Sequence, residues 1–384
     1  MTNSITTEVK TSEFDRTAGL YVHVPFCRSK CSYCGFYSIT DFDRVNNWKD
    51  AILQEAATFR CRFEFIDTVY FGGGTPSSLP KGIINEIYSG LKSIFRITPD
   101  AEITVEMNPD DVRKDLLREL RKGGVNRLSI GIQSLDDEIL TFLGRRHTSI
   151  DAKRAVELSR EEGYSNIGID LMYNIPGQTV SRWIDVLEAA LAMEPEHISC
   201  YELSLENGTP LKEHRGKLDC SRGFSEHDRQ FYLETSRIIT AREYLHYEVS
   251  NYARDFTFRS RHNRKYWIRD PYLGLGPSAH SMRGTRRWWN ARTIVKYLDS
   301  VRFTGNGIEA SEILTDEQIA LESLFLGFRN THGIPRSLIM SDQHNATITQ
   351  SLVERNLLRD EGNYFVPTVE GYLLADRLPL DYRL

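Results

Sequence analysis

The fold of this chain is decided by the stretch Leu20-Tyr-Val-His-Val-Pro-Phe-Cys-Arg-Ser-Lys-Cys-Ser-Tyr-Cys-Gly-Phe-Tyr-Ser38. Its apolar beginning predicts a short buried strand, which Pro25 ends. Cys27, Cys31 and Cys34 follow, with three residues between the first two thiols and two between the last two. The three thiols are therefore expected on the loop that leaves the end of a strand.

Three thiolates on one tight loop are too many for a disulfide and one too few for a closed zinc site. Iron–sulfur clusters are held by cysteine thiolates, usually four of them. Three cysteines on a [4Fe–4S] cluster would leave one iron free to bind something else. Two alternatives stay open from the spacing alone, namely a partial zinc knuckle completed by a distant histidine and a chance grouping.

Length and composition restrict the class of protein. The 384 residues predict two or three domains, or one large domain with an appendage, and the 40% hydrophobic content is ordinary for a globular protein with a sizeable core. The formal charge of −5 argues against nucleic-acid binding through a broad basic surface. No run approaches the length of a membrane span. Residues 1–18 lack the apolar core of a signal peptide and are expected to form a mobile tail.

The other cysteines are scattered through the chain. Cys61, Cys200 and Cys220 are expected to be small buried hydrophobic residues. Together with the thiol loop, they indicate a metal site in a reducing cytoplasm and not an oxidised disulfide framework.

Six predicted strands alternate with helices in the first half of the chain. The strands are expected at residues 20–24, 67–71, 102–106, 126–132, 166–171 and 197–203, and the helices at 44–59, 82–95, 116–122, 152–161 and 180–193. Such alternation predicts repeated βαβ units, and hence a parallel sheet with right-handed crossovers. Eight units would close a complete barrel. Six units predict an α/β fold with an open, partial (β/α)6 barrel.

The unusual residues fall at or just beyond the carboxyl ends of these strands. They are Cys27, Cys31, Cys34, Gly72, Gly73, Gly74, Thr75, Glu106, Gln133, Asp170, Glu202 and Ser204. Parallel α/β barrels and sheets build their sites on that rim, so we expect these residues to form the functional site.

The glycine run Gly72-Gly73-Gly74 would let backbone approach a ligand closely. It lacks the lysine of a P-loop and the spacing of a dinucleotide fold, so a phosphate cradle is not indicated. A tight turn is the structural alternative. Near an open iron, the run would suit the amino or carboxylate group of a ligand.

Charged residues on the rim predict polar ligand contacts. Glu106 and Asp170 end apolar strands, where an acidic residue is seldom buried without a partner, so they are expected to face an amine or hydroxyl groups. One of Arg145, Arg146 and His147 could pair with a carboxylate, and a solvated loop is the alternative.

Residues 204–310 are rich in aromatic and basic side chains. Within them, His262-Asn-Arg-Lys-Tyr266-Trp267 places an imidazole, a phenol and an indole together. Histidine and tyrosine are axial ligands of haem iron, and aromatic rings pack on a porphyrin face. Composition alone favours the alternative, a buried aromatic cluster with satisfied polar atoms. Residues 272–282 form a glycine-broken stretch that would bring backbone near the cavity.

Residues 311–384 form a separate piece. Thr315 is a candidate cap for a helix over residues 319–328, and a second helix at 348–355 precedes a hairpin at 357–366. This order predicts a small winged-helix-like domain. Because the segment is not notably basic, a lid or packing role is expected instead of nucleic-acid binding.

The predicted organisation thus has four parts. They are a mobile tail (1–18), the partial barrel (19–204), an aromatic-rich α+β extension that closes the barrel mouth (205–310) and the C-terminal domain (311–384).

The cysteine loop followed by Gly72-Gly-Gly-Thr-Pro76 resembles the radical S-adenosylmethionine (SAM) superfamily. The wider pattern is similar to its coproporphyrinogen oxidase-like branch, and most similar to the HemW-type haem chaperones, over residues 19–380. The matching segments are Tyr21-Val-His-Val-Pro-Phe26, Arg127-Leu-Ser-Ile-Gly-Ile-Gln-Ser134, Asp170-Leu-Met-Tyr-Asn-Ile-Pro-Gly-Gln-Thr179 and Leu275-Gly-Pro-Ser-Ala279.

This resemblance implies a [4Fe–4S] cluster on Cys27, Cys31 and Cys34, with SAM on the fourth iron. In such enzymes one electron from the cluster cleaves SAM to methionine and a 5′-deoxyadenosyl radical. The implied SAM contacts are Tyr21, Gly73 and Glu106, and the positions around a second SAM or a substrate are Gly74, Thr75, Gln133, Arg145 and Asp170.

Two positions separate the members of this branch. The oxygen-independent oxidase has a further cysteine where this chain has Phe36, and His262-Asn263-x-x-Tyr266-Trp267 matches the HNxxYW signature of the HemW type. The resemblance therefore implies a cytoplasmic haem chaperone that binds haem through this signature and delivers it to haem-dependent respiratory enzymes. It leaves open peripheral association with a membrane, and a monomer or a homodimer.

Two other functions remain as alternatives. The first is an oxidase that decarboxylates two propionates of coproporphyrinogen III. The second is a radical enzyme with an unrelated substrate, since fold does not fix function.

Overall fold

A computed structural model describes residues 17–215 and 225–383. Within these ranges one sheet of twelve strands has the order β12-β11-β10-β9-β1-β2-β3-β4-β5-β6-β8-β7, and a second sheet has three strands. The expected mobile tail lies outside the described residues up to residue 16. Its last residue, Ala18, already belongs to strand β1.

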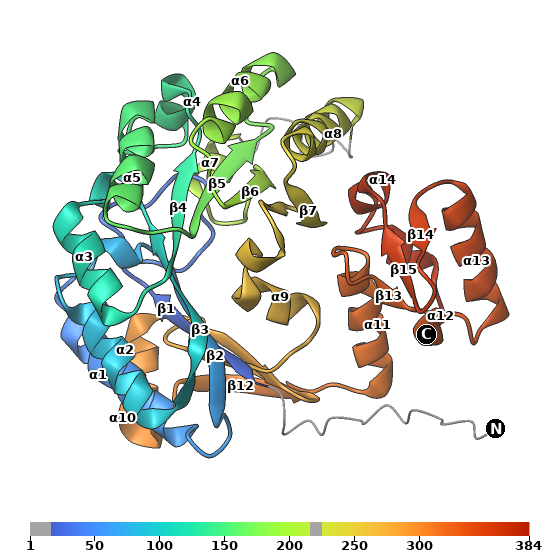
Figure 1. Ribbon diagram of the computed structural model, residues 1–384. Helices are drawn as coiled ribbons and strands as arrows, with labels where there is room; N and C mark the ends of the chain where they lie inside the picture. The colour runs from blue at the N-terminus through green and yellow to red at the C-terminus, as the bar shows by residue number, and fades with distance from the viewer. Residues whose placement is uncertain (1–16, 216–224, 384) are drawn as a thin grey trace, which may run out of the picture.

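The centre of the large sheet is a run of six parallel strands. They are β1 (Ala18–Val24), β2 (Phe65–Gly73), β3 (Arg96–Met107), β4 (Arg127–Gln133), β5 (Ile167–Tyr173) and β6 (His197–Glu202). Each strand pairs in parallel with the next. The predicted α/β fold with a partial (β/α)6 barrel is therefore confirmed, and Figure 1 shows the strands curving around an open centre.

Helices cover the outer face of these strands (Figure 1). They are α1 (Val45–Thr58), α2 (Ile83–Ile94), α3 (Lys114–Gly123), α4 (Asp137–Phe142), α5 (Ser149–Glu161) and α6 (Val180–Leu191). Five of them were expected from helical periodicity, and α4 is a short addition after β4. Each helix buries an apolar stripe, as α3 does with Leu116, Leu117 and Leu120, because burial of apolar surface holds the helix on the sheet.

The inner face of the barrel is polar. Along β4, Leu128 and Ile130 face the helices and are fully buried. The alternate residues Arg127, Ser129 and Gln133 line a cavity, since successive side chains of a strand point to opposite faces. A closed β/α barrel fills its interior with branched apolar side chains. The interior of this open barrel is lined with polar side chains, which suits a ligand that carries polar groups.

The segment after β6 extends the same sheet at both edges. Strands β8 (Asn251–Ala253) and β7 (Leu245–Glu248) continue from β6, and β9 (Tyr272–Leu275) pairs in parallel with β1. Beyond β9 follow β10 (His280–Arg283), β11 (Arg286–Asn290) and β12 (Ile308–Ile313). The helices of this segment are α7 (Pro210–Arg215), α8 (Glu226–Ala241), α9 (Arg261–Trp267) and α10 (Ile294–Thr304).

Helix α9 lies away from the barrel mouth, and closure of the mouth by the whole segment stays a prediction. Both backbone N–H groups at its start, those of Arg261 and His262, donate to the carboxylate of Glu102 in β3, at 3.2 and 3.1 Å. Lys265 pairs with Asp67 near the start of β2 at 2.8 Å. These contacts place α9 at the end of the barrel opposite the cysteine loop (Figure 1). Its buried polar side chains find their partners there.

Another part of the segment does lie at the mouth. The backbone N–H of Leu211 in α7 donates to the carbonyl oxygen of Ser32 in the cysteine loop at 2.9 Å. The extension therefore contributes to both ends of the barrel, with α7 near the thiols and α9 at the opposite end.

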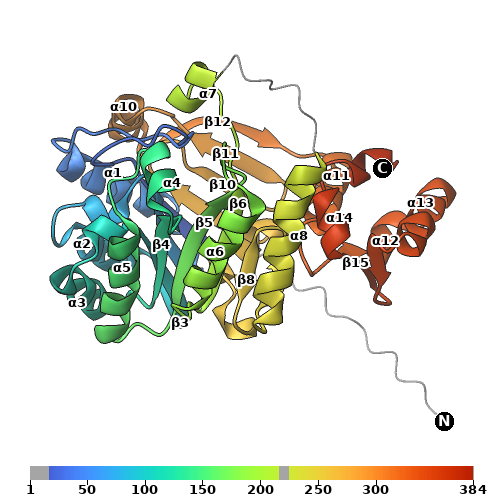
Figure 2. The same ribbon diagram turned by 90° about the horizontal axis from the view of Figure 1, so that it is seen from above.

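The C-terminal piece has its own small core, which includes Leu324, Phe328 and Phe365. Its elements are α11 (Asp316–Gly327), β13 (Ile334–Pro335), α12 (Arg336–Ile339), α13 (Gln343–Glu354), β14 (Leu358–Asp360), β15 (Tyr364–Pro367) and α14 (Val369–Leu373). Figure 2 shows it beside α8, where Arg229 pairs with Glu370 at 2.5 Å. The expected helices and hairpin are present, and the likeness to a winged helix stays a prediction.

Helix caps explain two boundaries of this piece. Thr315 caps α11 in a capping box with Gln318, as expected. Helix α13 begins at Gln343, five residues before the predicted start, because the carboxylate of Asp342 accepts a hydrogen bond from the N–H of Asn345 at 3.0 Å.

The scattered cysteines have different outcomes. Cys200 is buried, as expected. Cys61 is exposed, which contradicts the prediction, because it lies in the turn that follows α1 on the outer side of the barrel. Cys220 lies outside the described residues. Among the helices in the described ranges, none combines the length and apolarity needed to cross a bilayer.

A buried carboxylate joins the barrel to its extension. Glu55 of α1 accepts hydrogen bonds from Asn290 (2.8 Å) and Tyr297 (2.7 Å) and from the backbone N–H groups of Gly276 (3.0 Å) and Gly307 (2.9 Å). Burial raises the pKa of Glu55 to about 7, while these four donors act in the opposite direction. The carboxylate thus connects α1 to four residues that are more than 200 positions away.

Replacing this carboxylate should destabilise the whole protein. In Glu55→Gln an amide N–H₂ would face two donors, so we expect the free energy of unfolding to fall by about 3 kcal/mol, which urea titration measures. Glu64→Gln is the control, because Glu64 pairs with Arg96 on the surface. Equal unfolding midpoints for the two variants would contradict this account.

Candidate cofactor and ligand site

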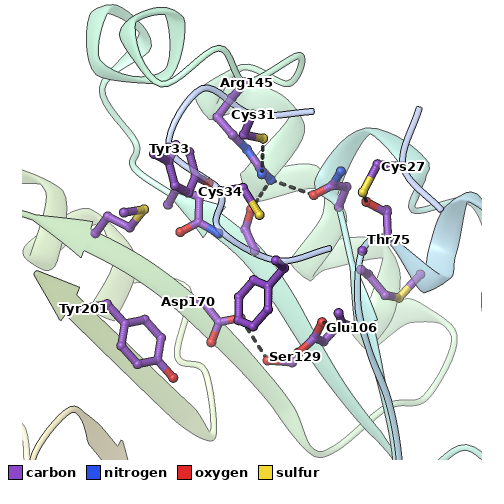
Figure 3. A pocket seen from close by; sticks show the side chains of 18 of the residues that line it. Cys27, Cys31, Tyr33, Cys34, Thr75, Glu106, Ser129, Arg145, Asp170 and Tyr201 are labelled. Carbon is purple, nitrogen blue, oxygen red and sulfur yellow. Dashed lines mark hydrogen bonds between the residues drawn. The ribbon is translucent and has the colours of Figure 1, made fainter. Parts of the chain in front are cut away.

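A cavity of about 740 Å3 occupies the barrel interior (Figure 3). All three cysteines of the loop line it, as do seven of the eight residues expected to contact SAM. Those seven are Gly73, Gly74, Thr75, Glu106, Gln133, Arg145 and Asp170. Its volume lies within the range of about 300–1,000 Å3 that is usual for ligand and cofactor pockets.

Backbone hydrogen bonds hold the cysteine loop in shape. The N–H of Cys27 donates to the carbonyl of Ile39 at 2.9 Å, and the N–H of Ile39 donates to the carbonyl of Pro25 at 2.7 Å. Inside the loop, the N–H of Cys34 donates to the carbonyl of Cys31 at 3.3 Å. The loop is therefore closed at its base, so that its three free thiols are presented on one short turn.

Two side chains from other strands donate toward these thiols. The hydroxyl of Thr75 donates to Cys27 Sγ at 3.3 Å, and Nη1 of Arg145 donates to Cys31 Sγ at 3.5 Å (Figure 3). Burial raises the pKa of the Cys27 thiol, and the Thr75 hydrogen bond acts in the opposite direction. A thiol binds iron as the thiolate. The donors thus favour the charge state that a cluster requires.

The donor set fits a cluster better than a single metal ion. Across the ranges that the structure describes, no three His, Cys, Asp or Glu side chains are grouped to hold one ion. This finding applies equally to the three thiols, so a partial zinc knuckle completed by a distant histidine stays an alternative. Three soft sulfur ligands on one loop at the edge of a roomy cavity suit an iron–sulfur cluster with one open position.

The glycine run passes directly against the cysteine loop. The N–H of Gly74 donates to the carbonyl of Val24 at 2.7 Å. A Cβ added at Gly74 would lie 2.6 Å from that oxygen and 3.1 Å from Cys27 Sγ. Gly73 has a φ of +104°, which an L side chain rarely adopts. Close approach to the thiol loop, and not the turn alone, therefore requires glycine here.

Two buried carboxyl groups share the cavity. Glu106 accepts hydrogen bonds from the hydroxyl of Tyr70 at 2.8 Å and from the N–H of Gly73 at 3.0 Å. Burial raises its pKa to about 7, and the nearby charge of Asp170 adds to this effect. Asp170 accepts from Ser129 Oγ at 3.0 Å. The pair suits a ligand that brings an amine or hydroxyl groups into the cavity.

Arg145 anchors the barrel to the cysteine loop. Its Nη2 donates to Asn108 Oδ1 and to the carbonyl of Gly131, both at 2.7 Å. Its Nε is buried without a partner among the described groups. The alternative of a solvated loop therefore does not describe Arg145, although the adjacent Arg146 does pair with Asp110 nearer the surface.

Gln133 ends β4 in an unusual conformation. Its φ of +66° lies in the left-handed region, and the pairing of β4 with β5 loses its regular register just before it. Such a backbone is costly for a residue with a side chain and often accompanies a functional site. Gln133 lines the cavity, in agreement with its predicted position on the rim.

Tyr21 is the one expected SAM contact that does not line the cavity. Its hydroxyl lies 3.1 Å from His23 Nδ1, and its ring stacks near that of His262 with centroids 6.3 Å apart. The side chain points into the barrel behind the glycine run, where a Cβ at Gly73 would be 3.0 Å from its hydroxyl. A direct contact with SAM stays a prediction.

The haem-binding candidates lie at the opposite end from the thiols. Nδ1 of His262 bonds Thr68 Oγ1 at 2.8 Å, and Nε2 bonds the hydroxyl of Tyr266 at 2.9 Å. Both ring nitrogens are therefore occupied, and burial lowers the pKa of His262 to about 3. Of the four candidates only Asn263 lines the cavity, and Trp267 is half-buried beside it.

These contacts correspond to the alternative that composition favoured, a buried aromatic cluster with satisfied polar atoms. An axial bond to haem iron from Nε2 of His262 would require its hydrogen bond with Tyr266 to break, and one from Nδ1 would require the bond with Thr68 to break. Haem binding by this signature stays a prediction.

The sequence interpretation missed several lining residues. They include Tyr33, Tyr70, Arg127, Ser129, His197, Ser199 and Tyr201. The available signal was strand alternation, because Arg127 and Ser129 lie six and four positions before Gln133 on the same face of β4.

Comparison with known proteins identifies the relatives of this chain. The radical SAM superfamily model matches residues 21–190. "Heme chaperone HemW" of Synechocystis is 36% identical over 82% of this chain and 78% of that protein, and that of Bacillus subtilis is 31% identical over 93% and 97%. A mitochondrial "Radical S-adenosyl methionine domain-containing protein 1" of Danio rerio is 33% identical over 83% and 74%.

Among solved structures, the Escherichia coli coproporphyrinogen III oxidase HemN, described as a radical SAM enzyme, superposes with a TM-score of 0.82. It covers 95% of this chain and 90% of that chain at 24% identity. This likeness concerns the fold.

The buried state of His262 predicts a measurable pH dependence. The unfolded chain protonates this imidazole near its ordinary pKa of about 6.5, whereas the folded protein holds the pKa at about 3. The free energy of unfolding should therefore fall as pH drops from 7 to 5, by up to about 1.4 kcal/mol per pH unit for each such histidine.

Urea titrations at several pH values test this expectation. His262→Gln should show a shallower slope than the unsubstituted chain, because it removes one group whose pKa differs between the two states. His227→Gln, at an exposed histidine of α8, should keep the original slope. An unchanged slope in His262→Gln would contradict the buried neutral state.

Proposed function

We propose a function from one premise: the chain belongs to the radical SAM superfamily and, within it, to the HemW family. The proposal is a cytoplasmic haem chaperone that binds a [4Fe–4S] cluster, SAM and haem, and delivers the haem to haem-dependent respiratory enzymes. Its main support is the similarity to proteins named haem chaperone HemW over most of their length, at 30–36% identity.

In this proposal Cys27, Cys31 and Cys34 hold the cluster, and SAM occupies its fourth iron. When bound, the cluster can supply the electron that cleaves SAM. The chain's own part is to hold and shield these groups. Thr75 and Arg145 donate to the ligand sulfurs, and the glycine run lets the end of β2 pack directly against the cysteine loop.

The two carboxyl groups would bind the polar parts of SAM. Glu106 keeps its orientation through Tyr70 and the N–H of Gly73, so it presents a fixed acceptor to the cavity. Asp170 is held in the same way by Ser129. Gly74 and Gln133 complete the proposed SAM contacts on the rim, with Tyr21 behind them.

Phe36 supports the chaperone over the oxidase. It stands where the resemblance places a further cysteine of the oxidase, it lines the cavity, and its side chain is 64% exposed. An apolar ring at the mouth can pack against a flat macrocycle. It cannot supply the thiol of the oxidase.

Haem would enter the same cavity and approach α9. Asn263 already lines the cavity, and His262, Tyr266 and Trp267 belong to the same helix. In this proposal His262 or Tyr266 would hold the haem iron, after the local hydrogen bonds of these side chains rearrange. The recipient enzymes would dock on the outside, with the protein acting as a monomer or a homodimer.

Removing one thiol should abolish the cluster. After anaerobic reconstitution with iron and sulfide, we expect four iron atoms per chain and a broad visible absorption, both lost in Cys27→Ala because two thiols cannot hold the cluster on this loop. Cys61→Ala should keep both, since Cys61 is exposed outside the site. Full iron content in Cys27→Ala would contradict the assignment.

Spectroscopy and product analysis separate chaperone from oxidase. Haem added to the protein should give a Soret band that His262→Ala or Tyr266→Ala weakens, because one of these side chains is the proposed ligand. With SAM, a reductant and coproporphyrinogen III, the reconstituted protein should form no protoporphyrinogen. Formation of that product would contradict a function as a chaperone only. An unchanged Soret band in both variants would exclude His262 and Tyr266 as ligands.

A further inference from the structure

The end of the cavity opposite the cysteine loop, here called its floor, contains a buried cation without a counter-ion. Arg127, the first residue of β4, is 2% exposed and lines the cavity. Its Nη1 donates to two neutral acceptors, Asn166 Oδ1 at 2.8 Å and the carbonyl of Phe258 at 2.9 Å. Across residues 17–215 and 225–383, no carboxylate lies within ion-pair distance of it.

An unpaired buried charge is expensive, so folded proteins usually pair it. Lys265, a buried cation of α9, follows this rule through its contact with Asp67 at 2.8 Å. Arg127 does not, and both of its hydrogen bonds use Nη1. Nε and Nη2 therefore remain available, and a guanidinium fork is well matched to a carboxylate.

The neighbours of Arg127 on the floor are neutral or already engaged. His197 bonds the hydroxyl of Tyr247 at 2.7 Å, and burial together with Arg127 keeps its pKa well below the ordinary value. Asn263 adds an amide from α9. Glu102, the nearby carboxylate, is occupied by the backbone N–H groups that begin α9 and does not line the cavity.

Asp170 is a carboxyl group of the cavity whose pKa is affected by the charge of Arg127. The charge of Arg127 lowers the pKa of Asp170, against the larger effect of burial, which raises it. The carboxylate of Asp170 nevertheless bonds Ser129 at 3.0 Å and lies beyond ion-pair distance from the guanidinium. It therefore leaves the fork of Arg127 open.

We propose that Arg127, together with His197 and Asn263 of the same cavity, forms a subsite that binds a carboxylate at the floor of the cavity. Two sources carry this group, a propionate of haem and the amino-acid end of SAM. Gln133 is six residues further along β4, at the cluster end, which is about 20 Å at a rise of about 3.3 Å per residue. SAM on the cluster lies at that far end, so the propionate is the favoured occupant. This choice rests on the proposed function.

Titrations of three probes test the subsite. Haem, haem dimethyl ester and SAM are each added to the full chain with its cluster reconstituted, and binding is followed by the Soret band or by calorimetry. The variants are Arg127→Gln, Arg127→Lys and the control Arg261→Gln. Arg261 is the first residue of α9, and its side chain contacts Asp100 outside the cavity.

We expect Arg127→Gln to weaken haem binding about tenfold or more, because a charge-assisted pair is lost. The dimethyl ester should bind the unsubstituted chain and Arg127→Gln equally, and Arg261→Gln should behave as the unsubstituted chain. A loss of SAM affinity alone would assign the subsite to the amino-acid carboxylate. Unchanged binding of both haem and SAM, or equal losses for haem and its ester, would overturn the proposal.

Two further outcomes, a variant that does not fold and a chain that binds no haem, also test the subsite. If Arg127→Gln fails to fold in a thermal melt, Arg127→Lys replaces it, since it keeps the charge but loses the fork. A selective loss for haem over the ester then supports the subsite, and equal affinities overturn it. If the unsubstituted chain binds no haem, the proposed function fails, and the SAM titration alone decides whether the floor holds a carboxylate.

Discussion

The polar inner face of the barrel is the constraint on which the rest of the structure depends. Buried polar groups must find partners, since an unsatisfied one costs about 1–3 kcal/mol. An open barrel lined by Arg127, Glu106 and Asp170 cannot be filled by apolar packing. Helix α9 therefore seals one end with matched hydrogen bonds, while the cysteine and glycine loops shape the other end around a cavity.

The same constraint divides the interior into two chemical ends. At the carboxyl ends of the strands, sulfur ligands receive hydrogen bonds from Thr75 and Arg145. At the floor, the aromatic signature on α9 is satisfied within the protein through the His262–Tyr266 contact. A flat ligand that reaches from one end to the other would lie between the sulfur ligands and the aromatic side chains of α9. Phe36 at the mouth offers it an apolar surface.

Much of the barrel was predictable because each βα unit carries its own local signals. Pro25 and the glycine run mark the ends of strands, and the apolar stripes of α1, α2, α3, α5 and α6 repeat at helical spacing. Rim residues could be found since parallel strands align their carboxyl ends. The partners of His262 could not be found in this way, because Thr68 is 194 positions away and only the folded barrel brings the two together. The unpaired state of Arg127 is likewise a property of its surroundings in space.

The central claim is that one cavity holds the cluster at the cysteine end and haem toward α9. Anomalous diffraction at the iron edge, from crystals grown anaerobically with iron, sulfide, SAM and haem, tests it most directly. We expect one strong iron peak bound by Cys27, Cys31 and Cys34 and a second, separate peak inside the same barrel. A haem iron peak on the outer surface, or no iron at the three thiols, would contradict it.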